Sequence, residues 1–208
     1  MSQADDREKV LSAFGGKRGL IDTGIPSVLF LIIFNLRDDL QDALYASIAI
    51  SLLLTFIRLA RRETVQHAFS GLIGVLISAW FANRTGNPSD VFVPKMLTNL
   101  GYGFVYLIAN IAGWPILGVM LGPILGENFA WRKDPVRKAA YIRASWIWVA
   151  LFFGRLVVQY PIYLSDNVNL LGAVNLAMGM PLFFATVYGS WLVLRNVPTT
   201  ISPPEEKD

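Results

Sequence analysis

The chain has 208 residues, of which 54% are hydrophobic and only 16% are charged, a composition that indicates a membrane protein because soluble domains are nearer a quarter charged. It has no cysteine and one histidine, His67, which excludes disulfides, thiolate chemistry and clusters of histidine or cysteine around a metal. The net charge of +3 is not gathered in one basic patch, so we expect no binding of nucleic acid.

The first 19 residues are polar and charged, and we expect no cleaved signal peptide, because a small-residue cleavage site does not follow. Glycines and charged residues alternate at 15–24. There Lys17 and Arg18 are suited to hold a lipid phosphate, and either Asp22 or Thr23 to cap the first helix. Lys17, Arg18 and Asp22 form a candidate cytoplasmic-entrance motif, and an ordinary helix entrance is the structural alternative.

Six apolar segments predict six transmembrane helices. They lie near residues 21–36, 40–57, 66–81, 92–112, 144–164 and 170–194. Residues 114–126 are also apolar but too short to cross, so they predict a re-entrant or interfacial element between helices four and five. The expected fold is an all-α bundle at 20–195, with a cytoplasmic segment at 1–19 and a disordered cytoplasmic tail at 196–208.

The basic residues orient this bundle. Of the 18 lysines and arginines, Arg155 falls inside a span and only Arg37, Arg84 and Lys95 fall in the segments on the outer side. Because cytoplasmic loops carry the excess of basic residues, both chain ends are predicted to be cytoplasmic. We expect a multi-pass protein of the plasma membrane, the inner membrane of a bacterium.

Arg155 is the one formally charged residue of the fifth span. It lies about 16 Å from the start of that span at 1.5 Å per residue, near the middle of a hydrocarbon core about 30 Å thick. A charge at this depth costs a few kcal/mol even on lenient insertion scales, so we expect the folded protein to compensate it.

Two main interpretations of Arg155 stay open. In the first, Arg155 joins Gln159 and Asn175 in a polar clasp between helices five and six. Pro181 cannot donate to the carbonyl of Ala177, so the sixth helix should kink there and offer free carbonyls to the guanidinium. In the second, these side chains bind an anionic or carbonyl-bearing ligand, or a permeating ion, in a wet cavity. Snorkelling of the side chain is a third alternative.

Two further segments have simpler explanations. The predicted outer loop at 83–90 is rich in turn-forming residues, and Arg84 is expected to pair with Asp90. The basic stretch at 131–138 is expected to contact anionic lipid headgroups on the cytoplasmic side. The membrane is therefore the main expected partner, together with other membrane proteins.

The usual catalytic residue sets are missing from this sequence. The carboxylates are scattered at the predicted span ends, and none lies in the middle of a span. With no cysteine, no second histidine and no pair of buried acids, we predict a protein that is not an enzyme, with no catalytic residue, no metal and no cofactor.

A set of short motifs in a fixed order extends over nearly the whole chain. They are Gly15-Gly16, Arg18-Gly19, Ile21-Asp22, Pro26, Arg58-Leu59, Arg61-Arg62-Glu63, Gly71, Gly74-Val75, Arg84-Thr85-Gly86, Trp131-Arg132, Asp134, Arg155-Leu156, Val158-Gln159, Pro161 and Tyr163. In this combination the chain resembles an uncharacterised family of actinobacterial integral membrane proteins, known as a domain of unknown function. The resemblance implies a membrane location and no particular activity.

A fainter likeness is to the bacterial intracellular septation protein A family. It rests on Ile21-Asp22, Pro26, Pro94-Lys95, Trp114-Pro115-Ile116-Leu117 and Met120-Leu121-Gly122. This likeness implies a role in envelope synthesis and division through partners, and it transfers no catalytic residue. The leading expectation is a non-enzymatic membrane protein that acts through partners or lipids in envelope maintenance. The alternative is a small transporter or channel component in which Arg155 lines a polar pathway.

Overall fold

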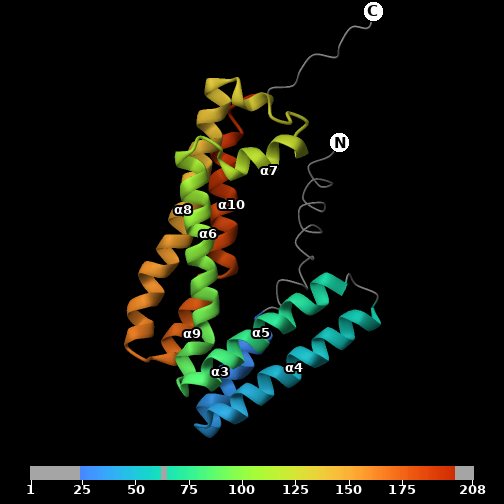
Figure 1. Cartoon of the computed structure of the whole chain (residues 1–208), viewed down its shortest axis with the longest axis vertical. Helices are drawn as coiled ribbons and strands as arrows, with labels where there is room; N and C mark the ends of the chain where they lie inside the picture. Colours follow the sequence, from blue (N-terminus) through green and yellow to red (C-terminus); the bar gives the residue numbers. More distant parts are fainter. Residues whose placement is uncertain (1–23, 62–64, 200–208) are drawn as a thin grey trace, which may run out of the picture. The chain divides into compact units, whose positions relative to one another are not determined.

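The computed structural model describes residues 24–61 and 65–199, and in these residues it contains helices and no strand. The all-α prediction is confirmed. The α-helices, shown in Figure 1, are α3 (Ile25–Arg37), α4 (Leu40–Ala60), α5 (Val65–Thr85), α6 (Val93–Ile111), α7 (Ile116–Ile124), α8 (Pro135–Leu164), α9 (Val168–Ala177) and α10 (Met180–Leu194). Two short 3-10 helices join them, η1 (Pro88–Phe92) and η2 (Ala130–Arg132).

Four helical segments within the described residues are long and apolar enough to cross a membrane. They are Leu40–Ala60, Pro88–Ile111, Pro135–Leu164 and Val168–Leu194. The prediction of six spans is confirmed only to this extent. Helix α3 has 13 described residues and a length of about 20 Å, which is less than the hydrocarbon thickness of about 30 Å. The crossing of α5 stays a prediction, because its first side chains lie outside the described ones.

Short acidic and amide side chains set where several helices begin. The Asp39 carboxylate accepts hydrogen bonds from the backbone N–H groups of Gln41 and Asp42 at the start of α4. Asn87, Asp134 and Asn167 cap η1, α8 and α9 in the same way. Such caps satisfy backbone donors that have no partner within the helix, so they fix the short loops between helices.

The chain divides into two compact units, and the first comprises Met1–Met96 and Gln159–Leu176. Its described part holds α3, α4, α5 and η1 with the ends of α6 and α8 and most of α9. Its core is formed by Phe30, Ala43, Leu44, Ala79, Ala82, Phe92, Val168 and Leu171. Gly172 allows α9 to lie close to α3, since a Cβ atom there would overlap with the side chain of Leu31.

The second unit comprises Leu97–Val158 and Ala177–Asp208. Tyr106, Val149, Leu151 and Phe152 form one of its core clusters, with residues of α6, α7, α8 and α10 packed around them. In Figure 1, α6, α8 and α10 run alongside one another. The nine-residue α7 is too short to cross a membrane, and its Gly122 permits close contact with Trp131, whose Cδ1 lies 2.9 Å from where a Cβ atom would be.

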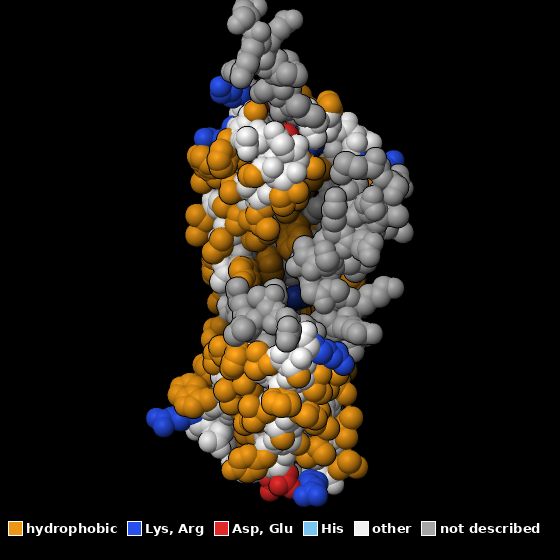
Figure 2. All heavy atoms as spheres, turned by 90° about the vertical axis from the view of Figure 1, so that its right-hand side faces the viewer, with side chains coloured by type: hydrophobic (Ala, Val, Ile, Leu, Met, Phe, Trp, Pro, Cys, Tyr) orange, Lys and Arg blue, Asp and Glu red, His pale blue; other side chains and the backbone are white. Residues whose placement is uncertain are grey.

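Large hydrophobic side chains lie on the surface as well as in the core. Ile111 and Val157 are each 73% exposed, and Ile124 is 74% exposed. Figure 2 shows hydrophobic side chains over most of the described surface on the visible face. Exposed apolar area on this scale needs an apolar surrounding, which supports a membrane protein.

Several predictions concern residues that the structure does not describe. Lys17, Arg18 and Asp22 all lie outside the described residues, and so does the tail from residue 200 onward. The cytoplasmic-entrance motif, the segment at 1–19 and the disorder of 196–208 therefore stay predictions.

Candidate functional site

The helical segment Val168–Leu194 is interrupted inside its apolar run. Helix α9 ends at Ala177, and α10 begins at Met180 with Pro181 in its first turn and Gly179 as its N-cap. A proline has no N–H to donate and its ring clashes with the preceding turn, so a continuous helix is not possible here. The interruption leaves the carbonyl of Met178 without the hydrogen bond of a continuous helix, and inside a candidate membrane span such a group needs another donor.

Arg155 lies at this interruption within the second unit. Its Nη2 donates hydrogen bonds to the carbonyl oxygens of Met178 and Gly179, the latter at 2.8 Å. The side chain is half-buried, and its Nε is buried with no acceptor among the described residues. One guanidinium nitrogen thus bonds both carbonyls, of which that of Gly179 also accepts from the backbone N–H of Phe183 at 3.2 Å.

Gln159 and Asn175 are both buried, at 2% and 7% exposure, but they belong to the first unit. The Oδ1 atom of Asn175 is buried with no donor among the described residues. That these two side chains act together with Arg155 stays a prediction. The choice between a structural clasp and a ligand site also stays a prediction.

Three loops of the first unit meet through side-chain hydrogen bonds. Gln41 donates to Asn83 at 2.7 Å and joins the start of α4 to the end of α5. Asn35 and Asn169 donate to each other at 2.6 and 2.7 Å and join α3 to α9. Asn87 Nδ2 donates to Asp166 Oδ1 at 2.8 Å.

These six residues link the α3–α4, α5–η1 and α8–α9 loops pairwise, and we call them the loop cluster. The chain turns sharply within it, since Asp166 has φ +51° and Gly86 has φ +75°. Both residue types adopt this left-handed conformation more readily than most others.

Asp90 lies in η1, three residues after Asn87, and its carboxylate accepts a hydrogen bond from the hydroxyl of Tyr163 at 2.6 Å. The predicted pair between Arg84 and Asp90 is therefore wrong. The 3-10 turn of η1 places Asp90 in the interior, where it is 6% exposed, whereas Arg84 stays exposed.

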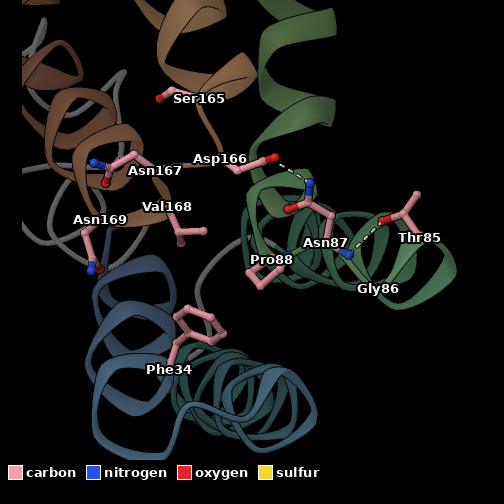
Figure 3. Close-up of a pocket in the computed structure, with 10 residues that line it drawn as sticks. All are labelled: Phe34, Thr85, Gly86, Asn87, Pro88, Ser165, Asp166, Asn167, Val168 and Asn169. Atoms are coloured by element: carbon pink, nitrogen blue, oxygen red, sulfur yellow. Dashed lines mark hydrogen bonds between the residues drawn. The ribbon is translucent and has the colours of Figure 1, made fainter.

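A hollow of about 690 Å³ opens among these loops. It is lined by Phe34, by 85–88 and by 165–169. Figure 3 shows the side chains of Phe34, Pro88 and Val168 around the hollow, with the bonded pair of Asn87 and Asp166 along one edge. The lining carries one carboxylate, several amides and hydroxyls, and no lysine or arginine. It is suited to hold a neutral polar molecule that also has an apolar face.

The second unit contains a buried ion pair that the sequence did not predict. Arg137 Nη2 lies 2.5 Å from Glu127 Oε1, and each residue is 2% exposed. Tyr141 donates to the same carboxylate at 3.3 Å, and Arg137 Nη1 donates to the carbonyl of Val197 at 2.8 Å. The pair therefore fastens the segment after α7 to the chain that follows α10.

This pair corrects the interpretation of the basic stretch at 131–138. Trp131 is fully buried and Arg137 is held by Glu127, so neither is free to contact lipid headgroups. Arg132 and Lys133 of the same stretch are exposed. A signal was present in the sequence, since Glu127 is the one acid between Asp90 and Asp134, but the charges alone did not show which of them is buried.

The chain belongs to the family described as "Protein of unknown function (DUF3159)", whose family model matches residues 14–201. The matched range includes the helix interruption, the loop cluster and the buried ion pair. No curated protein and no solved structure matches the chain. Membership of an uncharacterised family is confirmed, whereas the actinobacterial source and the likeness to septation proteins stay predictions.

Proposed function

We propose that this protein is a non-enzymatic, multi-pass protein of the plasma membrane that acts through partners or lipids in envelope maintenance. The loop cluster is the observation that carries the proposal. Hydrogen bonds between amide and carboxylate side chains hold its three loops in one arrangement. Loops held rigidly by a scaffold are where recognition surfaces usually lie, and a hollow opens among these.

In the predicted orientation, with both chain ends cytoplasmic, the loop cluster faces the outside of the cell. A partner or lipid of the envelope would meet it there. On the opposite side, we propose that the exposed Arg132 and Lys133 contact anionic lipid headgroups of the cytoplasmic leaflet.

The contacts of Arg155 also support this proposal. Its guanidinium already donates to two carbonyls of the chain, so its hydrogen bonds serve to join α8 to the interrupted helix. A charge used in this way stabilises the fold and needs no solute to compensate it.

The alternative is a small transporter or channel component in which Arg155 lines a polar pathway. Two observations favour it: the helix is discontinuous within its apolar run, and Arg155 Nε has no acceptor among the described residues. Transporters commonly bind solutes at such interruptions. We place the transporter function second because Arg155 already donates to two carbonyls of the chain, those of Met178 and Gly179.

The proposal is tested by complementation of a strain that lacks the gene, with envelope integrity measured as survival in detergent. Asn169→Ala removes the paired bonds to Asn35, which contribute about 0.5–1.5 kcal/mol each and are too weak to unfold the protein. We expect this variant to reach the wild-type level in the membrane and to rescue poorly.

Arg84→Ala is the matched control, because Arg84 is exposed beside the loop cluster and is not part of it. It should rescue like the wild type. Full rescue by Asn169→Ala would contradict the proposal, as would an unaltered envelope in the strain that lacks the gene.

A further inference from the structure

We infer that the hollow of the loop cluster binds a neutral pyranose sugar, either a free sugar or the headgroup of a glycolipid. The inference rests on the proposed function, since it names the ligand of the same cluster. A pyranose ring has an apolar face of C–H groups and an edge of hydroxyl groups, and the two halves of the hollow match these features.

The apolar half is formed by Phe34, Pro88 and Val168, which surround the hollow in Figure 3. Phe34 is held in place by stacking on Phe30, with ring centroids 6.0 Å apart, and by packing against the core of the first unit. Val168 is buried in that core. An aromatic ring fixed in the lining of a polar hollow offers a flat surface for the C–H face of a sugar.

The polar half has hydrogen-bonding groups that could pair with a ligand. Asn87 donates to Oδ1 of Asp166, which leaves the second carboxylate oxygen of Asp166 as an acceptor. The amide oxygen of Asn167 caps α9 through the N–H of Leu170, so its two N–H groups remain as donors. Sugar hydroxyls both donate and accept, so they can pair with the carboxylate and with the amide.

Charge and size narrow the ligand class further. The lining holds one carboxylate and no basic side chain, so a phosphate or carboxylate ligand would be repelled. The hollow, of about 690 Å³, is wide and open to its surroundings, so it suits a ring that binds with one face against the lining and the other exposed. A neutral sugar satisfies both conditions.

The test is saturation-transfer NMR with the full chain in phosphatidylcholine nanodiscs and methyl α-D-glucopyranoside as the probe. We expect saturation of the C–H protons on one face of the ring, with a Kd on the order of 1 mM. Asp166→Asn keeps an oxygen that can accept from Asn87 but removes the charge, and should weaken binding about tenfold. Phe34→Leu keeps an apolar side chain in the core but removes the flat ring. With this variant, saturation should no longer be confined to the C–H protons on one face of the sugar.

Arg84→Ala serves as the control and should bind the probe like the wild type. Nanodiscs that also contain monoglucosyl diacylglycerol identify the source of the ligand. If the glycolipid competes with the probe, the ligand is a lipid headgroup. If it does not compete, the ligand is a free sugar. Both results agree with the inference.

The inference is overturned if the wild type gives no saturation above that of Asp166→Asn, or if choline binds in place of the glucoside. These failures are distinguishable from a failure of the proposed function. If the probe does not bind while Asn169→Ala still fails to rescue the envelope, the sugar is wrong and the role of the loop cluster stands.

Discussion

Replacing Arg155 with leucine is expected to lower the free energy of unfolding within the membrane by about 2–4 kcal/mol, because a hydrogen bond to a charged group contributes about 1.5–3 kcal/mol. The substitution leaves the carbonyls of Met178 and Gly179 without this donor. At the depth predicted for Arg155 from the sequence, water is scarce and does not replace the guanidinium. Arg155→Lys should be intermediate, since an ammonium group lacks the planar fork of the guanidinium.

The measurement is reversible unfolding in mixed micelles. Val157→Leu is the matched control, because Val157 lies two residues further along α8 and is 73% exposed, and it should leave stability unchanged. If Arg155→Leu is as stable as the wild type and yet inactive in cells, Arg155 binds a ligand and the structural interpretation is wrong.

The second large effect is expected at the buried ion pair. Glu127→Leu leaves Arg137 charged in an interior where it is 2% exposed, and we expect a loss of about 3–5 kcal/mol of stability. The double variant Glu127→Leu/Arg137→Met removes both charges and should be more stable than the single variant. A buried pair can often be replaced by apolar residues at little cost, whereas removal of one partner leaves an uncompensated charge.

Thermal unfolding of the two variants beside the wild type measures this difference. Lys133→Met removes an exposed charge from the same basic stretch and should change stability by less than about 0.5 kcal/mol. A double variant no more stable than Glu127→Leu would show that the two charges are not coupled in the folded protein.

The apolar helices and a disturbance at Pro181 could be predicted from the sequence, because they depend on local properties, but the predicted kink is a full break between α9 and α10. Apolar runs of about 20 residues indicate membrane spans, and a proline cannot continue a helix hydrogen bond. The depth of Arg155 in its span, obtained by counting residues, stays a prediction. The end of the short α3 was also predicted to within one residue, since the apolar segment was placed at 21–36 and α3 ends at Arg37, where Asp38 follows with φ +52°.

The loop cluster and the ion pair depend on which distant segments meet. Asn35 and Asn169 are 134 positions apart and have the composition of ordinary turn residues. Arg137 lies in a stretch whose basic residues all fit a lipid-facing surface, and only the fold shows that Glu127 faces it. Composition predicts that a segment turns or carries charge, but not its neighbours in space.

The central question is whether Arg155 closes the interior or lines a path through it, and a cysteine at position 159 tests this most directly. The chain has no native cysteine, and Gln159 lies one helical turn beyond Arg155 with 2% exposure. We predict that Gln159→Cys reacts at least about 100-fold more slowly with a membrane-impermeant thiol reagent than Arg84→Cys, from either side of the membrane. A closed site reacts only through local opening that costs about 2.7 kcal/mol or more. Rapid labelling of position 159 from one side, with protection by an anionic or polar solute, would contradict the account and establish the pathway.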